Sequence, residues 1–270
     1  MPLPTTLALP AHTELAAPPS WRGIDFLSDL HLGPDTPRTF DAWVAHMRHT
    51  DADAVVILGD LVETWVGDDG RFDGFDAAFA EAFTAAARLR PTYFMVGNRD
   101  FLLGQEMLDA CGVRPLADPT VLTAFGRRAL LVHGDELCLG DTPYQRFRRQ
   151  VRDPSWQRQA LAQPLAVRRQ IARDMRQKSA AHQQQMSGRP VEGGGNSDVD
   201  RPTAIRWLQE ADATVMLHGH THRPGSETLG PGLERHVLSD WDLEAPTPHA
   251  EIMRWCATGL ERRPPASAPA

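Results

Sequence analysis

The stretch IDFLSDLH at residues 24–31 decides the fold, because a short apolar run ends directly in a polar cluster. Four further stretches repeat this arrangement. They are AVVILGD at 54–60, YFMVGNRD at 93–100, ALLVHGD at 129–135 and TVMLHGHTH at 214–222. Short apolar runs rich in aliphatic and β-branched side chains are typical of buried strands. We therefore expect five strands, each ending in side chains that can bind a ligand.

Helical periodicity separates these strands. Apolar side chains recur at helical spacing in residues 38–50 and again from Phe72 to Phe83, and residues 201–211 are predicted to form a further helix. Strands alternating with helices indicate a mixed α/β core. Taken alone, this pattern favours a doubly wound sheet.

Length, composition and charge exclude several classes of protein. The 270 residues, 41% hydrophobic and 23% charged, suit one globular domain with an insertion. A net charge of −7 argues against a general nucleic-acid-binding protein. No apolar run approaches the roughly 18–20 residues that cross a bilayer. Cys111, Cys138 and Cys256 are far apart, which predicts a reducing, cytoplasmic compartment without disulfides.

Residues 141–186 differ from the rest of the chain. They carry a net charge of +7, they contain no strand-like run, and Pro154 and Pro164 divide their helical pattern into two or three helices. We interpret residues 141–190 as a basic helical insertion between the fourth and fifth strands. The expected boundaries are a main domain at 21–260, a flexible loop at 187–196, and disordered tails at 1–20 and 261–270.

The polar clusters contain seven candidate metal ligands. These are Asp29, His31, Asp60, Asn98, His133, His218 and His220. The set has no thiolate, which disfavours a structural zinc site and favours manganese, iron or zinc in a catalytic role. Seven ligands exceed the needs of one ion. Two ions about 3.5–4 Å apart would use them, and such pairs hold the attacking and leaving oxygens of a phosphoryl transfer.

Each cluster also has a simpler explanation on its own. Asp29 and His31 could lie in a surface turn, and His133 could be a core histidine. All five clusters in this order are hard to explain by coincidence. We interpret His222 as a loop residue or as one that orients a ligand, and Asp135 as orienting His133 or as a turn residue.

The order D-x-H, G-D, G-N-x-D, H-G-D and G-H-T-H resembles the calcineurin-like metallophosphoesterase superfamily. Longer stretches are similar to its UDP-2,3-diacylglucosamine diphosphatase family. They are SDLHL at 28–32, LGDLVETWVGDD at 58–69, GNRDFLL at 97–103, HGDELC at 133–138 with its extension to Arg148, and HGHTHRP at 218–224. The resemblance covers about residues 22–242. It implies a metallophosphoesterase fold, a two-layer β-sandwich flanked by helices, and makes residues 141–190 a helical lid.

The resemblance also implies two Mn²⁺ ions, with other divalent metals possible. The implied ligands are Asp29, His31, Asp60 and His220 for one ion, and Asp60, Asn98, His133 and His218 for the other, with Asp60 bridging. The implied catalytic residues are Asp60, Asn98, Arg99 and His218. Substrate contacts are expected at Asn98, Arg99, Asp141, Tyr144, Ser179 and His218, whereas Gln183 and Met186 replace two polar contacts of the family.

The implied enzyme hydrolyses the diphosphate bond of UDP-2,3-diacylglucosamine in lipid A biosynthesis. Metal-activated water attacks the α-phosphorus, giving UMP and 2,3-diacylglucosamine 1-phosphate. One alternative is a related metallophosphoesterase acting on a soluble nucleotide diphosphate or phosphodiester, and another is an inactive scaffold of this fold. We expect a peripheral membrane protein that binds the cytoplasmic face of the inner membrane through this lid. No nucleic acid and no obligate protein partner are expected.

Arg99 stands where many superfamily members have a histidine that acts as a general acid. An arginine cannot deliver a proton at neutral pH. A phosphate monoester leaves without one, because its second pKa is about 6. We therefore expect Arg99 to neutralise charge on the diphosphate. The alternative is an ion pair with Asp100 or Asp68.

Overall fold

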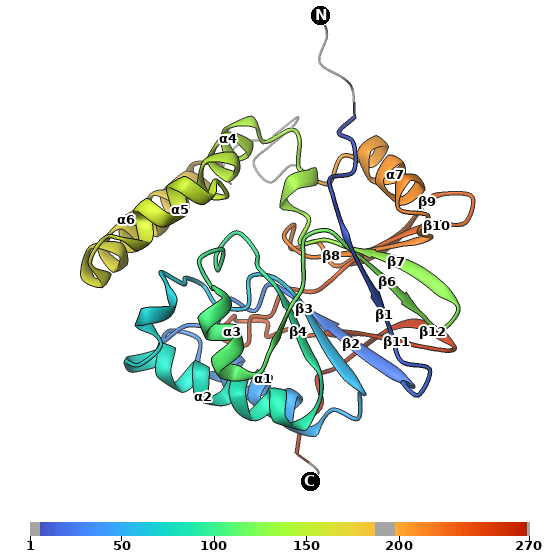
Figure 1. The fold of residues 1–270 in the computed structure, drawn as a ribbon, viewed down its shortest axis with the longest axis horizontal. Helices are drawn as coiled ribbons and strands as arrows, with labels where there is room; N and C mark the ends of the chain where they lie inside the picture. The colour runs from blue at the N-terminus through green and yellow to red at the C-terminus, as the bar shows by residue number, and fades with distance from the viewer. Residues whose placement is uncertain (1–5, 187–197, 269–270) are drawn as a thin grey trace, which may run out of the picture.

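Two six-stranded sheets pack face to face, and helices cover their outer faces (Figure 1). The computed structural model describes residues 6–186 and 198–268, with side chains described as far as Arg176 in the first range. One sheet has the order β1 (Thr13–Ala16), β6 (Thr120–Ala124), β7 (Arg127–Leu131), β8 (Val215–His218), β10 (Leu233–Val237) and β9 (Gly225–Gly230). The other has the order β12 (Gly259–Arg263), β11 (Ile252–Cys256), β2 (Gly23–Leu27), β3 (Ala54–Leu58), β4 (Thr92–Met95) and β5 (Arg114–Pro115).

The helices lie in two outer layers and one projecting group. The β2–β3–β4 sheet is covered by α1 (Pro37–His49), α2 (Gly74–Leu89) and α3 (Gln105–Cys111), and the other sheet by α7 (Arg201–Glu210). Two short 3₁₀ helices, Asp68–Gly70 and Asp135–Leu137, lie in loops. The projecting group comprises α4 (Thr142–Val151), α5 (Pro154–Leu161) and α6 (Leu165–Met186) (Figure 1).

Strand β3 shows why the central strands are apolar throughout. Successive side chains of a strand point to opposite faces of the sheet. Val55 and Ile57 pack under the helices, whereas Val56 and Leu58 pack into the layer between the two sheets. Both faces of the strand are therefore buried, and an uninterrupted apolar run satisfies both.

This arrangement corrects the doubly wound interpretation and confirms the β-sandwich. The five predicted strands exist, each within two residues of its predicted bounds, but β2, β3 and β4 belong to one sheet and β7 and β8 to the other. A strand buried on both faces has the same apolar pattern in either architecture, so the pattern could not distinguish them.

The prediction of disordered tails is wrong for the residues that the structure describes. β1 pairs with β6 in parallel, and Trp207 donates its indole N–H to the carbonyl of Leu7 (3.0 Å). At the other end β12 continues to Arg263, and the Ala266 N–H donates to His46 Nδ1 (3.1 Å). Backbone pairing holds these edge segments, and it leaves little signature in the side chains. The loop predicted at 187–196 lies outside the described residues.

The helical lid consists of three helices, with a proline in the first turn of α4 and of α5. Its positive charge partly serves to attach it to the main domain. Arg168 is buried and binds the Asp69 carboxylate, and Arg169 lies 3.4 Å from Asp73 and 3.4 Å from Asp76. The basic composition of the lid therefore complements acidic side chains around α2.

A buried ion pair joins β2 to β11 on the sheet face that α1 covers, where His46 Nε2 lies 3.5 Å from Asp25 Oδ2. Arg254 binds the fully buried Asp25 and lies 2.8 Å from Asp51. Arg254→Ala would leave Asp25 charged and unpaired, so we expect a loss of about 3–5 kcal/mol in the free energy of unfolding. Chemical denaturation would measure this, with the exposed Arg88→Ala as the control. Equal stability of the two variants would show that the pair contributes nothing.

Candidate metal centre

Five strand ends meet at one place between the two sheets. The Asp29 N–H donates to the Gly59 carbonyl (3.1 Å), which joins the loops after β2 and β3. The Gly219 N–H donates to the His133 carbonyl (3.0 Å) in the other sheet. The two halves connect where the His220 N–H donates to the Asp29 carboxylate (3.0 and 2.9 Å). The polar clusters predicted from the sequence therefore form one site.

The backbone at this site is strained. Seven non-glycine residues in the described parts of the chain have positive φ, and five of them lie here. They are Asp29, His31, Asp60, His220 and His222, with φ between 49° and 67°. Such conformations cost of order 1–3 kcal/mol each and cluster at functional sites. The strain is therefore evidence that these five residues belong to a functional site.

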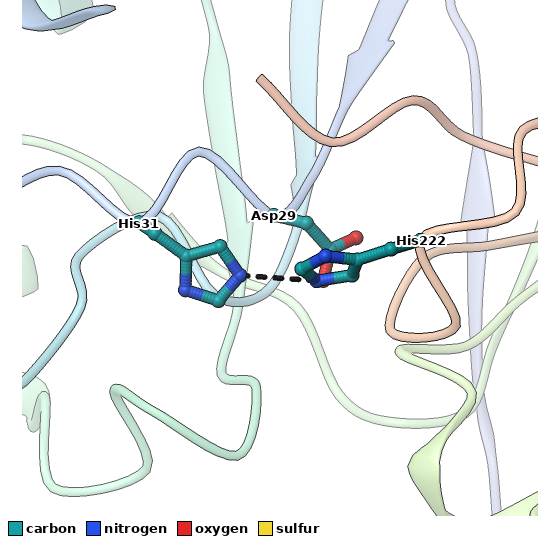
Figure 2. A group of neighbouring side chains, drawn as sticks. All are labelled: Asp29, His31 and His222. Carbon is teal, nitrogen blue, oxygen red and sulfur yellow. Dashed lines mark hydrogen bonds and ion pairs between the residues drawn. The ribbon is translucent and has the colours of Figure 1, made fainter. Parts of the chain in front are cut away.

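The first group of ligands consists of Asp29, His31 and His222 (Figure 2). His31 Nε2 lies 3.2 Å from His222 Nε2, and His222 Nε2 lies 3.6 Å from Asp29 Oδ1. Asp29 is buried, whereas His222 is partly exposed. The three donor atoms converge on one point, where a cation would contact all of them.

The second group consists of Asp60, His133 and His220, with Asn98 between the two histidines. Asn98 Oδ1 lies 3.0 Å from His133 Nε2 and 2.8 Å from His220 Nδ1. His133 Nε2 lies 3.7 Å from Asp60 Oδ1. One carboxylate, one amide oxygen and two imidazoles suit a divalent transition metal.

The two histidines of the G-H-T-H motif are assigned differently from the prediction. His220 lies in the second group, and His222 takes the place that the prediction gave to His220. His218 belongs to neither group. Its Nδ1 lies 2.8 Å from the Gly219 carbonyl, and burial together with the charge of Arg235 lowers its pKa to about 4. Its Nε2 is buried and has no hydrogen-bond partner among the described residues, so the expected role of His218 as a metal ligand stays a prediction.

Two features of the site fit bound cations. His31 Nδ1 lies 2.8 Å from Glu63 Oε2, and His222 Nδ1 lies 3.4 Å from Asp240 Oδ2. The two Nε2 atoms face each other at 3.2 Å, and a cation between the rings would bind both lone pairs. The site is also closely packed, because a Cβ atom at Gly97 would overlap Oδ1 of Asp60.

Gly97→Ala is expected to abolish metal binding by the second group. The added methyl would displace the Asp60 carboxylate, and displacements of about 1 Å can cost a hundredfold in rate. Isothermal titration with Mn²⁺ and hydrolysis of a phosphodiester would measure the loss. Gly230→Ala places its methyl in open space and serves as the control. Normal metal binding by Gly97→Ala would contradict the geometry of this group.

Comparison with known proteins identifies the family. The family model for calcineurin-like phosphoesterases matches residues 23–224, and this range includes every residue of both ligand groups. The chain belongs to the calcineurin-like phosphoesterase family. Membership makes it a metal-dependent hydrolase, as the two ligand groups indicate.

Relatives within this family cover most of the chain. A UDP-2,3-diacylglucosamine hydrolase of Stenotrophomonas maltophilia is 40% identical over 88% of this chain and 98% of its own length. That of Bordetella parapertussis is 41% identical over 82% of this chain and 86% of its own. Among solved structures, a phosphoesterase from E. coli covers 90% of this chain and 99% of its own with 14% identity and a TM-score of 0.42.

The electrostatic field in this phosphoesterase site favours positive charge. Burial lowers the pKa of His133, but the nearby charges of Asp60, Asp135 and Asp29 outweigh burial and raise the pKa to about 9. Burial and the Asp60 charge raise the pKa of Asp100 to about 6. A field that stabilises an imidazolium also stabilises a metal cation at the same place.

Arg99 lies at the edge of the site and forms its ion pair with Glu63. Arg99 Nη1 lies 3.6 Å from Glu63 Oε1. The predicted alternatives are engaged elsewhere, because Asp100 accepts the N–H groups of Gly97 and Leu61, and Asp68 accepts the indole N–H of Trp65. The Arg99 guanidinium is therefore not held by a neighbouring aspartate.

The expected substrate contacts on the lid have structural partners. Asp141 caps α4 by accepting the Tyr144 N–H (3.0 Å). The Tyr144 hydroxyl donates to Asp135 (2.6 Å), and its ring centre lies 5.6 Å from that of His220. Asp135 thus binds the lid and does not contact His133 through its side chain. Ser179 lies outside the described side chains, as do Gln183 and Met186.

Sequence reasoning missed Glu63 and Asp240. Both carboxylates face the outer ring nitrogen of a candidate ligand, His31 for Glu63 and His222 for Asp240. Glu63 stands three residues after Asp60, in a loop where the sequence already predicted a metal ligand. Asp240 follows β10 in a part of the chain without a signal. Only the folded chain brings it to the site.

Proposed function

We propose that this chain hydrolyses the diphosphate bond of UDP-2,3-diacylglucosamine to UMP and 2,3-diacylglucosamine 1-phosphate, a step of lipid A biosynthesis, with two Mn²⁺ ions. The observation that carries the proposal is the pair of adjacent ligand groups. Two metal ions held side by side can bind the attacking and leaving oxygens of a phosphoryl transfer. The relatives named UDP-2,3-diacylglucosamine hydrolase, at about 40% identity over most of the chain, support this substrate.

In this proposal, Asp29, His31 and His222 hold one ion, and Asn98, His133 and His220 hold the other. His218, whose buried Nε2 has no partner among the described residues, stays a proposed ligand of the second ion. Asp60, whose Oδ1 lies 3.7 Å from His133 Nε2, is the proposed shared ligand. When bound, such ions polarise phosphoryl oxygens and lower the pKa of water. The chain fixes Asp60 for this role by donating the backbone N–H of Arg99 to its Oδ1 (2.8 Å).

The Arg99 side chain supplies charge without a proton. Its Nε is buried and has no hydrogen-bond partner among the described residues. A phosphate oxygen would satisfy this donor. The leaving sugar phosphate is stable as an anion, so no general acid is needed, and none of the groups around Arg99 has to provide one.

The lid suits an acylated substrate. Leu161, Val167, Ile171 and Met175 expose between 39% and 49% of their surface, and the last three recur every four residues along α6. A row of exposed apolar side chains usually marks a binding surface. Acyl chains of the substrate would cover it. Asp141, Tyr144 and Ser179 remain proposed contacts to the sugar.

We further propose that the protein binds the cytoplasmic face of the inner membrane peripherally. Among the described residues, no helix combines the length and the apolar character required to cross a bilayer. Arg146, Arg149 and Arg158 on the lid are exposed and form no ion pair with described residues. Each such charge contributes about 1 kcal/mol of attraction to an anionic surface.

The test compares substrates that share the diphosphate but differ in acyl chains. UMP release from UDP-2,3-diacylglucosamine in detergent with Mn²⁺ should exceed release from UDP-N-acetylglucosamine by at least about a hundredfold in kcat/KM, because burying each methylene contributes about 0.8 kcal/mol. EDTA should abolish both. Faster cleavage of a soluble dinucleotide or phosphodiester would replace the substrate. A protein that binds no metal and cleaves nothing would be an inactive scaffold.

A further inference from the structure

Glu63 contacts three functional parts of the molecule with one carboxylate. Its Oε2 lies 2.8 Å from Nδ1 of the metal ligand His31. Its Oε1 lies 3.6 Å from Nη1 of Arg99 and 3.0 Å from Nε of Arg176 on α6. The Glu63 side chain is only 15% exposed, so these contacts are shielded from water. The metal centre, the loop after β4 and the lid therefore meet at a single side chain.

The two arginines at Glu63 could exchange this carboxylate for another anion. Two guanidinium groups face one carboxylate oxygen, and the side chain of Arg176 is 49% exposed, so it can reach other partners. A nucleoside diphosphate brings two negative charges to the same edge of the site. Its oxygens can replace the Glu63 carboxylate as partners of both guanidinium groups, since phosphate and carboxylate bind guanidinium in the same bidentate way.

We propose that Glu63 is a positioning residue that couples the lid to the metal centre. Before substrate binds, Glu63 holds Arg176 and Arg99 in place. When a diphosphate binds, the two arginines turn to it, and Glu63 keeps its contact with His31. The inference extends the proposed function, because it takes the diphosphate as the ligand of this site.

Two substitutions at Glu63 separate its two roles. Glu63→Gln keeps an oxygen for His31 but removes the charge that competes for the arginines, so UDP should bind the Mn²⁺-loaded protein about three- to tenfold more tightly. Glu63→Ala also removes the contact with His31, and Mn²⁺ affinity should fall about 10–100-fold. A role in stability alone predicts neither the tighter UDP binding nor the difference between the variants.

The lid partner is tested by a double-mutant cycle. Arg176→Gln should weaken UDP binding without changing Mn²⁺ affinity. In Glu63→Gln/Arg176→Gln, most of the gain from Glu63→Gln should disappear, because one of the freed arginines is gone. Arg173→Gln is the matched control, since Arg173 lies on the same helix and donates a hydrogen bond to Gln170. It should leave both affinities unchanged.

Calorimetry with UDP and with Mn²⁺ keeps this test separate from the proposed function. If the wild type does not hydrolyse UDP-2,3-diacylglucosamine, the substrate assignment fails, whereas the binding cycle still decides the role of Glu63. Unchanged UDP affinity in folded Glu63→Gln would overturn the coupling. So would strictly additive effects of Glu63→Gln and Arg176→Gln, or unchanged Mn²⁺ affinity in Glu63→Ala.

Discussion

Asp60→Ala is expected to lower kcat/KM by at least about a thousandfold, equivalent to about 4 kcal/mol of transition-state stabilisation. Asp60 is buried, lies 3.7 Å from His133, and is the carboxylate that both proposed ions share. Its removal takes a ligand from each ion at once. The variant should still fold, because the loss also relieves the repulsion between Asp60 and the buried Asp100.

Steady-state kinetics with Mn²⁺ and metal analysis of the purified protein would measure this effect. Asp41→Ala, which removes an exposed carboxylate from α1, should match the wild type in both. A folded Asp60→Ala protein that keeps two equivalents of metal and more than about a tenth of the activity would exclude Asp60 as the bridge.

His222→Ala and His218→Gln are expected to differ sharply. His222 faces Asp29 and His31, so its loss should remove about one equivalent of Mn²⁺ and lower kcat/KM about a hundredfold or more. His218 is fully buried, lies in neither group of three, and has an Nε2 without a hydrogen-bond partner among the described residues. If His218 only packs in the core, its replacement should lower the unfolding temperature but leave the metal content intact, whereas a ligand role predicts a loss of metal.

Metal content and activity of the two variants, measured at a temperature where both are folded, decide between the assignments. Loss of metal in His218→Gln with normal metal content in His222→Ala would restore the assignment made from the sequence and reject the structural one.

The central strands and most ligands could be predicted, because their signals are local. An apolar run followed by Asp, Asn or His is visible in the sequence at all five strand ends. The sandwich could not be derived from these runs and came from the family resemblance. Two of the strands that complete the sheets are short or exposed edges, the two-residue β5 and the largely exposed β1.

The ligand assignments that the sequence leaves open depend on spacing and on distance along the chain. Three histidines within five residues leave their roles open until the backbone turns are known. The left-handed conformations of His220 and His222 direct their side chains to different ligand groups. Glu63 and Arg176 contact partners more than thirty residues away, and Asp240 contacts His222 across the β9–β10 hairpin, so sequence order gives no sign of these contacts.

Hydrolysis of UDP-2,3-diacylglucosamine in heavy-oxygen water, with mass analysis of both products, tests the central claim most directly. Attack on the α-phosphorus predicts Mn²⁺-dependent release of UMP that carries one heavy oxygen, together with unlabelled 2,3-diacylglucosamine 1-phosphate. Label in the sugar phosphate, or no Mn²⁺-dependent UMP from the wild type, would contradict the account.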